Sequence, residues 1–311
     1  MLRGLLLLGA TVPLVGLGGA TTPHVHNGRI AYAHVGNGNR LQIYTTTASG
    51  ARRRHLTSGH RYSSYDPAYS PSGKRIAFVR SNTSQDIWTM NANGADKRAL
   101  TRTPGGQEVD PAWSPDGKQI AFAVLGPPPG QGIWLLRPDG KGSRVRVISG
   151  ADRAPAWSPD GSEIAFERAD ATKQTISLLV VPSGGGTPTN LSSDPGVSDL
   201  EPAWSPDGSR ILFASDRPDG SQLDLWVLNL RAATPGQSVV RVTNTPSRDE
   251  RDPAWSPDGR RIVYSGMGAF HGASSSQIYL SNANGSHRRI LTHACGECAW
   301  INDDPSWQPL P

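Results

Sequence analysis

Carboxylates recur at matched positions along this sequence, each directly before a proline and three residues before an aromatic side chain. They are Asp66, Asp110, Glu201, Asp252 and Asp304, and Ala154 takes the equivalent position in one repeat. Carboxylates gathered around one opening would bind a divalent cation or a basic peptide segment. The simpler interpretation is that each accepts local hydrogen bonds where a strand begins. The sequence alone leaves both interpretations open.

Two cysteines, Cys295 and Cys298, form the only Cys-x-x-Cys pair in the sequence, two residues after His293. Zinc sites of this kind need a second pair or further histidines at suitable spacing, and neither follows nearby. We expect a local structural disulfide, with a metal site or a redox-active pair as the alternatives.

No catalytic motif stands out in the chain. It has no Gly-x-Ser-x-Gly nucleophile elbow, no His-Glu-x-x-His and no phosphate-binding Gly-x-x-x-x-Gly-Lys. We therefore assign no catalytic residue and lean towards a binding protein rather than an enzyme. We expect no cofactor, apart from a divalent cation that the carboxylates could hold.

The carboxylates belong to a repeated phrase, acidic-Pro-Ala-aromatic-Ser-Pro-Asp-Gly, which is followed by a short apolar run. Its aromatic anchors are Tyr69, Trp113, Trp157, Trp204, Trp255 and Trp307, spaced 44, 44, 47, 51 and 52 residues apart. Short strands repeating every ~40–50 residues are typical of propeller blades. We interpret the anchors as packing between blades rather than as sugar-binding platforms. The recurring turn aspartates, such as Asp116, are interpreted as bonding their own backbone.

The two ends of the chain predict how the ring closes. Residues 29–57 contain the second, third and fourth strands of a blade without the first, and the chain finishes on a first strand. We predict an all-β, six-bladed β-propeller with four antiparallel strands per blade, in which the C-terminal strand completes the first blade. Such closure leaves no open sheet edge between the first and last blades.

The N-terminal segment predicts export. Residues 1–20 combine Arg3, an apolar run and small residues ending at Ala20, the pattern of a signal peptide, with an uncleaved anchor as the alternative. Residues 21–28 are expected to form a short tail and residues 29–311 the propeller. We expect a periplasmic or extracellular protein with no transmembrane segment after cleavage.

The formal net charge is +5 and the isoelectric point is about 9.4. The basic clusters at 52–55, 97–98 and 287–289 fall on or beside the strand predicted to be outermost in each blade. Lys and Arg on edge strands discourage edge-to-edge pairing, so we expect a monomer and no nucleic-acid partner.

The repeated phrase Asp-Pro-x-Trp-Ser-Pro-Asp-Gly, followed by Ile-Ala-Phe, resembles the WD-repeat-like blades of the TolB-like six-bladed propeller family. The resemblance covers residues 29–309 and does not include the α/β domain that precedes the propeller in TolB. It implies a non-enzymatic scaffold of the cell envelope that binds an envelope protein, and the carboxylates themselves indicate a basic peptide segment as the alternative partner. Similar phrases occur in oligogalacturonate lyases and prolyl-oligopeptidase-like peptidases. The alternative function is therefore a propeller enzyme, a metal-dependent saccharide lyase or a lactone hydrolase, working in the central channel.

One mouth of the channel is expected to carry the function. The loops at 58–65, 125–132, 193–200, 215–223 and 266–276 differ between repeats, whereas the turns at the opposite mouth are short and nearly identical. Variable loops on a rigid scaffold are where recognition usually lies, and the carboxylates are predicted to open at this same mouth.

Overall fold

The computed structural model describes residues 26–35, 40–127, 129–192, 194–217, 222–231, 238–270, 273–292 and 302–310. The predictions for residues 1–20 and for Cys295 and Cys298 lie outside the described residues. No helix in the described ranges is long and apolar enough to cross a membrane.

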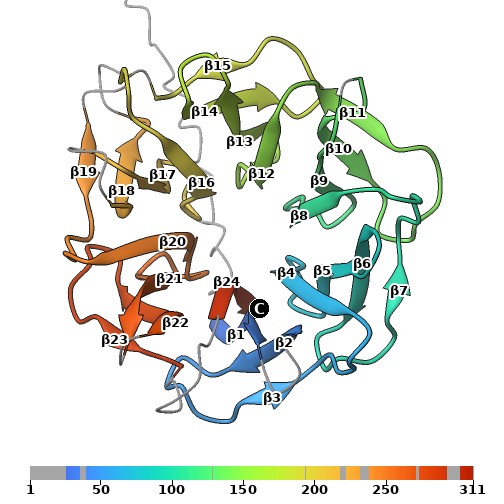
Figure 1. Ribbon diagram of the computed structural model, residues 1–311, viewed down its shortest axis with the longest axis horizontal. Helices are drawn as coiled ribbons and strands as arrows, with labels where there is room; N and C mark the ends of the chain where they lie inside the picture. The colour runs from blue at the N-terminus through green and yellow to red at the C-terminus, as the bar shows by residue number, and fades with distance from the viewer. Residues whose placement is uncertain are drawn as a thin grey trace, which may run out of the picture.

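Six four-stranded antiparallel sheets surround a central channel, as Figure 1 shows. Blade one consists of β24 (Asn302–Leu310), β1 (His26–Val35), β2 (Leu41–Thr46) and β3 (Arg54–His55). Blade two consists of β4 (Ser63–Tyr69), β5 (Arg75–Ser81), β6 (Gln85–Asn91) and β7 (Arg98–Ala99). Blade three consists of β8 (Glu108–Trp113), β9 (Ile120–Val124), β10 (Gly132–Leu136) and β11 (Val145–Ile148).

The second half of the ring repeats this order. Blade four consists of β12 (Asp152–Trp157), β13 (Glu163–Asp170), β14 (Thr175–Pro182) and β15 (Thr189–Asn190). Blade five consists of β16 (Asp199–Trp204), β17 (Arg210–Ser215), β18 (Asp224–Asn229) and β19 (Val239–Arg241). Blade six consists of β20 (Arg248–Trp255), β21 (Arg261–Phe270), β22 (Ala273–Asn282) and β23 (Arg289–Ile290). The predicted six-bladed all-β fold is confirmed.

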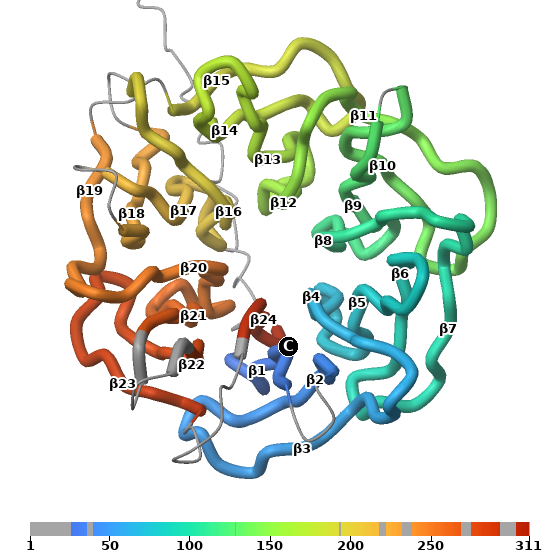
Figure 2. The backbone as a smooth tube through the Cα atoms, in the orientation of Figure 1, coloured from blue at the N-terminus to red at the C-terminus, as the bar shows by residue number. Residues whose placement is uncertain are grey.

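Blade one is built from both ends of the chain. Strand β24 pairs antiparallel with β1, with Ala33 opposite Asp303 and His26 opposite Leu310, and Figure 2 shows β24 as its innermost strand. The predicted closure by the last strand is therefore confirmed. Strand β1 begins at His26, inside the segment 21–28 that the sequence analysis assigned to a tail.

The blades pack through their second strands, where an aromatic residue is shielded from solvent on both faces of the sheet. These residues are Tyr32, Phe78, Phe122, Phe166, Phe213 and Tyr264, each no more than 1% exposed. Burying a side chain of this size contributes about 1.5–3 kcal/mol. Five hydrophobic clusters bridge neighbouring blades, so apolar packing crosses every seam of the ring.

Indole groups tie neighbouring blades together near the channel. Trp113 Nε1 donates to the Ala68 carbonyl at 3.1 Å, and Trp157 Nε1 donates to the Ala112 carbonyl at 3.2 Å. In both cases the acceptor lies in the preceding blade, and Trp255 repeats the contact with Ala203. The structure thus places these anchors at the seams between blades.

The aspartate of each Ser-Pro-Asp-Gly turn accepts hydrogen bonds from residues of the same turn. Asp116 accepts hydrogen bonds from Ser114 Oγ and from the Lys118 amide, and these bonds lower the pKa of its carboxyl. Gly117 has a φ of 70°, a conformation that glycine adopts without steric cost. The turns form a fixed rim at one end of the channel.

Candidate binding channel

A β-bulge in every innermost strand aims the carboxylates into the channel. In β4, Asp66 and Pro67 together oppose the single residue Phe78 of β5. The same register shift occurs in the other five blades. The first residue of each bulge has a φ between 48° and 56°: Asp66, Asp110, Ala154, Glu201, Asp252 and Asp304. Aspartate tolerates this left-handed conformation better than most residues, which suits it to the position.

These six positions are linked by hydrogen bonds that run around the channel in one direction. The Asp110 amide donates to Asp66 Oδ2 at 3.3 Å, and the Asp66 amide donates to Asp304 Oδ2 at 3.3 Å. The Asp252 amide donates to Glu201 Oε2 at 2.7 Å. The Asp304 backbone donates to Asp252, which closes the circle between blades six and one. Each carboxylate therefore accepts from the next blade. We call these six positions, with their carboxylates, the carboxylate ring.

The ring stays closed at Ala154 because a different strand supplies the missing carboxylate. The Ala154 amide donates to Asp110 Oδ2 at 3.0 Å, but the alanine side chain has no acceptor to offer blade five. Glu167, on β13 of the same blade, takes that place, and its Oε2 accepts from the Glu201 amide at 3.0 Å. Glu167 lines the channel cavity together with the residues of the innermost strands, so a second strand reaches into the channel here. We include Glu167 in the carboxylate ring.

The ring surrounds a cavity of about 310 Å³, lined mostly by acidic residues and the prolines that follow them. Arg153, from the blade that carries Ala154, also lines it and is the one basic side chain among the described lining residues. The cavity is therefore acidic on most of its circumference and carries a positive charge at blade four.

Burial and mutual repulsion raise the pKa values of the ring. Burial, with a further contribution from Asp110, raises the pKa of Asp66 to about 7. Burial raises the pKa of Glu167 to about 7, and that of the neighbouring Asp303 to about 6. Burial also raises the pKa values of the remaining carboxylates, Asp110, Glu201, Asp252 and Asp304. A positive charge in the cavity would stabilise their ionised forms.

The structure corrects two details of the expected acidic site. The carboxylates lie inside the innermost strands rather than where those strands begin, so the ring is set within the channel. The backbone amides that donate to them belong to the adjacent blade rather than to the local backbone. Both differences have the same cause, the bulge, which a search for strand starts does not reveal.

Within the described ranges, no three His, Cys, Asp or Glu side chains converge closely enough to hold a metal ion. The carboxylates reach sideways to the next blade instead of towards a common point.

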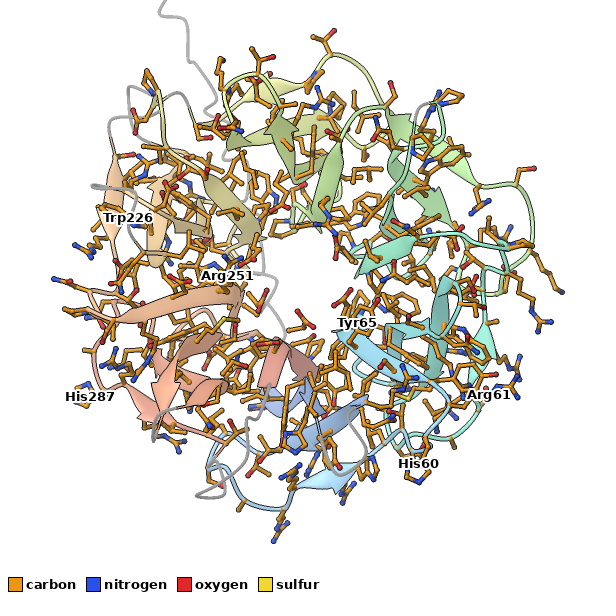
Figure 3. The ribbon with its side chains drawn as sticks, in the orientation of Figure 1. His60, Arg61, Tyr65, Trp226, Arg251 and His287 are labelled. Carbon is orange, nitrogen blue, oxygen red and sulfur yellow. The ribbon has the colours of Figure 1, made fainter. Side chains whose placement is uncertain are left out.

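A second hollow lies beside the ring at the mouth formed by the variable loops. It has a volume of about 310 Å³ and is lined by residues of three blades, including Ser198, Asp216, Gln222 and Asp249. Arg251 also lines it and lies 3.5 Å from Glu201 of the ring. Histidines close to the carboxylate ring would favour the alternative of a propeller enzyme. Figure 3 shows His60 at the outer rim, whereas Arg251 lies beside the channel. His271 and His293 lie outside the described residues.

Comparisons with known proteins agree with this architecture. A model of the TolB beta propeller domain family matches residues 21–124 and 136–310. A search of the curated proteins finds no match. Among solved structures, TolB from Acinetobacter baumannii is similar, with 22% sequence identity and a TM-score of 0.74 over 90% of this chain and 66% of that one. This chain therefore spans just under two thirds of the length of that protein.

Two further structures share the fold. The putative TolB from Agrobacterium tumefaciens has 17% identity and a TM-score of 0.67, over 91% of this chain and 99% of that one. An oligogalacturonate lyase solved in complex with manganese has 16% identity and a TM-score of 0.52, over 88% of this chain and 75% of that one. The family match over most of the chain, on six blades with bulged inner strands, leads to one conclusion: this chain belongs to the TolB beta propeller domain family.

Proposed function

We propose that this chain is an exported binding scaffold whose channel receives a cationic segment of an envelope protein. The observation that carries the proposal is the carboxylate ring around a cavity large enough for a few side chains. Lys and Arg side chains bring their own donors, and a guanidinium pairs with a carboxylate in a fixed two-point geometry. Export rests on the pattern of residues 1–20.

The hollow beside Arg251 would give the scaffold its selectivity. It is lined partly by the loops that differ between blades and partly by strands β14, β16 and β20, and it adjoins the ring through the contact between Arg251 and Glu201. A segment that places its charge in the ring would lay its flanking residues along these loops. The ring would supply attraction for positive charge, and the loops would distinguish one segment from another.

Neutralising two ring carboxylates should weaken cation binding and leave the fold intact. Asp110→Asn with Asp252→Asn keeps an oxygen acceptor for the neighbouring blade and tolerates the left-handed backbone, but removes two negative charges. With an oligo-lysine peptide as probe, fluorescence anisotropy should show affinity lowered on the order of tenfold or more. An unchanged melting temperature would show that the propeller survives.

The matched control removes the same charge outside the channel. Asp139→Asn with Asp170→Asn changes one loop residue and the last residue of β13, which form ion pairs with Arg137 and Lys173. This control should bind the peptide like the unmodified protein. Equal weakening in both double variants would mean that overall charge, and not the ring, attracts the peptide.

Stability should rise as the pH falls from about 8 to about 5. With pKa values of about 7 for Asp66 and Glu167, the native ring binds more protons than the unfolded chain between about pH 4.5 and 7. Excess protons on the native state mean that unfolding becomes harder as the pH falls through this window. Melting temperatures measured across it should show this slope, and Glu167→Gln should flatten it. A melting temperature that falls steadily from pH 8 to 5 would contradict the raised pKa values.

A further inference from the structure

Five blades place an arginine over an aromatic ring of their third strand. These pairs are Arg53 over Tyr44, Arg80 over Trp88, Arg144 over Trp134, Arg241 over Trp226 and Arg288 over Tyr279, with the guanidinium carbon 4.1–5.9 Å from the ring centre. Stacking of this kind fixes the guanidinium plane and leaves its edge N–H groups available to an anion.

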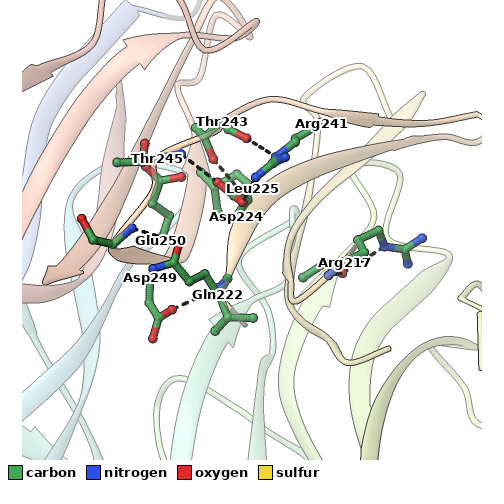
Figure 4. A network of polar contacts seen from close by, with 12 residues as sticks. Arg217, Gln222, Asp224, Leu225, Arg241, Thr243, Thr245, Asp249 and Glu250 are labelled. Carbon is green, nitrogen blue, oxygen red and sulfur yellow. Dashed lines mark hydrogen bonds and ion pairs between the residues drawn. The ribbon is translucent and has the colours of Figure 1, made fainter. Parts of the chain in front are cut away.

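In blades three, five and six a buried carboxylate occupies that edge. Arg144 pairs with Glu108, Arg241 with Asp224, and Arg288 with Glu250. All three carboxylates are 3% exposed or less. Figure 4 shows the contact of Arg241 with Asp224, together with the threonines that bond to these acids. In these blades the stacked arginine completes an internal ion pair.

The stacked arginines of blades one and two form no such ion pair, although blade two carries Asp86 on β6 where blade five carries Asp224 on β18. Neither Arg53 nor Arg80 forms an ion pair with any described residue, although Arg80 lies 4.2 Å from the Tyr62 ring centre and 4.7 Å from that of Trp88. Asp96, an acid on the loop before β7, pairs with Arg98 at 2.8 Å. Two adjacent blades thus present stacked guanidinium groups that form no ion pair within the described ranges, even though Asp86 is the cross-strand partner of Arg80.

Further cations join these two arginines into a continuous basic strip: Arg53, His55, Lys97, Arg80 and Arg61. The imidazole of His55 stacks on the ring of Tyr44, the ring that Arg53 also contacts, and the two ring centroids are 4.3 Å apart. Besides burial, Arg53 and Lys97 lower the pKa of His55, and Arg80 lowers that of Lys97. Arg61 lies over Tyr62, and Figure 3 shows it at the outer rim with His60. The strip therefore crosses blades one and two, and its cations repel one another.

We propose that the basic strip binds a linear polymer of phosphate groups. Its arginines present forked N–H donors, which match phosphate oxygens in two-point contacts. The row of cations fits a chain with repeating charge better than a single anion. Protection of sheet edges explains charge on β3 and β7, but it does not explain Arg80 on β5 or Arg61 in a loop, each held against an aromatic ring.

Two features of the strip favour a phosphate chain over other polyanions. The faces of Tyr44 and Tyr62 are already in contact with cationic side chains, so they offer little surface for stacking nucleic-acid bases. Peripheral attachment to a bilayer usually adds apolar side chains to the charge. The exposed large apolar residues that the structure describes, Val145, Val240, Met267 and Leu310, all lie outside the strip.

The test uses inorganic polyphosphate as the probe and calorimetric titration as the readout. The intact protein should bind it at low salt, bind orthophosphate far more weakly, and lose affinity as salt rises. Arg53→Ala with Arg80→Ala should lower the affinity on the order of tenfold, the effect of losing two exposed ion pairs. An unchanged melting temperature and unchanged binding of the oligo-lysine peptide would localise the defect to the strip.

Lys118→Ala with Lys173→Ala is the matched control. It removes two exposed lysines that lie outside the strip, and its net charge equals that of the arginine double variant. It should bind polyphosphate like the intact protein. An equal loss in the control, or none in the arginine variant, would overturn the proposal. So would intact protein that binds phosphatidylglycerol vesicles but not polyphosphate, which would assign the strip to a membrane. Tighter binding of oligothymidylate than of polyphosphate would overturn it in favour of nucleic acid.

Discussion

Removal of residues 303–311 should abolish soluble folding. Strand β24 is the inner strand of blade one and buries Trp307 to 5% exposure. It also joins blade one to blade two, because the Asp66 amide donates to Asp304 and Gln308 Nε2 donates to the Gly73 carbonyl at 2.8 Å. Losing a buried tryptophan alone costs about 3–5 kcal/mol, a large share of the 5–15 kcal/mol that stabilises a typical protein. Circular dichroism and size exclusion of the truncated chain would measure the loss.

A circular permutant tests whether the truncated chain fails because strand β24 is missing or because the position of the chain ends has changed. Because His26 pairs with Leu310, a short turn can connect residue 310 to residue 26, with new ends placed between 292 and 302. This chain keeps every strand and should fold with a melting temperature near that of the parent. A truncated protein that melts like the full chain would show that β24 does not hold the ring closed.

Glu167→Ala should destabilise the propeller by about 1–3 kcal/mol, and Ala154→Asp should restore much of that loss. The substitution leaves the Glu201 amide without the acceptor that Glu167 now supplies at 3.0 Å, and a buried unsatisfied donor carries a cost of this size. An aspartate at position 154 has the backbone conformation of the other ring residues, with φ at 48°, and would offer its carboxylate to blade five. Chemical denaturation of both single variants and the double variant measures the coupling.

The pH dependence of the Ala154→Asp variant gives a further test of this double-mutant cycle. Ala154→Asp alone adds a carboxylate beside Glu167, so it should lower stability at pH 8, where both are ionised, more than at pH 5. Glu163→Ala serves as the control, since it removes a glutamate from the same strand at a position that does not line the cavity. A double variant no more stable than Glu167→Ala would show that the two positions do not share one role.

The blade count, the strand order and the closure were predictable because each rests on a repeated signal. The aromatic anchors repeat at nearly constant spacing, and a blade without its own first strand must take one from elsewhere. The start of β1 was placed too late, because His26 and Asn27 lack the apolar character of a buried strand and form one only through pairing with β24.

The channel was predictable in part. Matched acidic positions identified the members of the ring on the innermost strands, but their depth depends on a bulge, and a proline after an acid does not by itself indicate one. Glu167 was missed because the sequence analysis compared only the residue directly before the proline of each repeated phrase. Comparing the residue after the buried aromatic would have exposed it: Val79, Ala123, Ala214 and Ser265 stand where blade four has Glu167. Blade four thus carries its carboxylate on the second strand rather than on the innermost strand.

The one-way course of hydrogen bonds around the channel makes each ring amide a reporter of a single seam. The amides of Asp66, Asp110 and Ala154 each bond to the blade before their own, so opening one seam exposes one amide to solvent exchange. A ligand that draws a carboxylate towards the channel axis would loosen the amide of the following blade. Hydrogen exchange at these positions would therefore map, seam by seam, which blades respond when the channel fills.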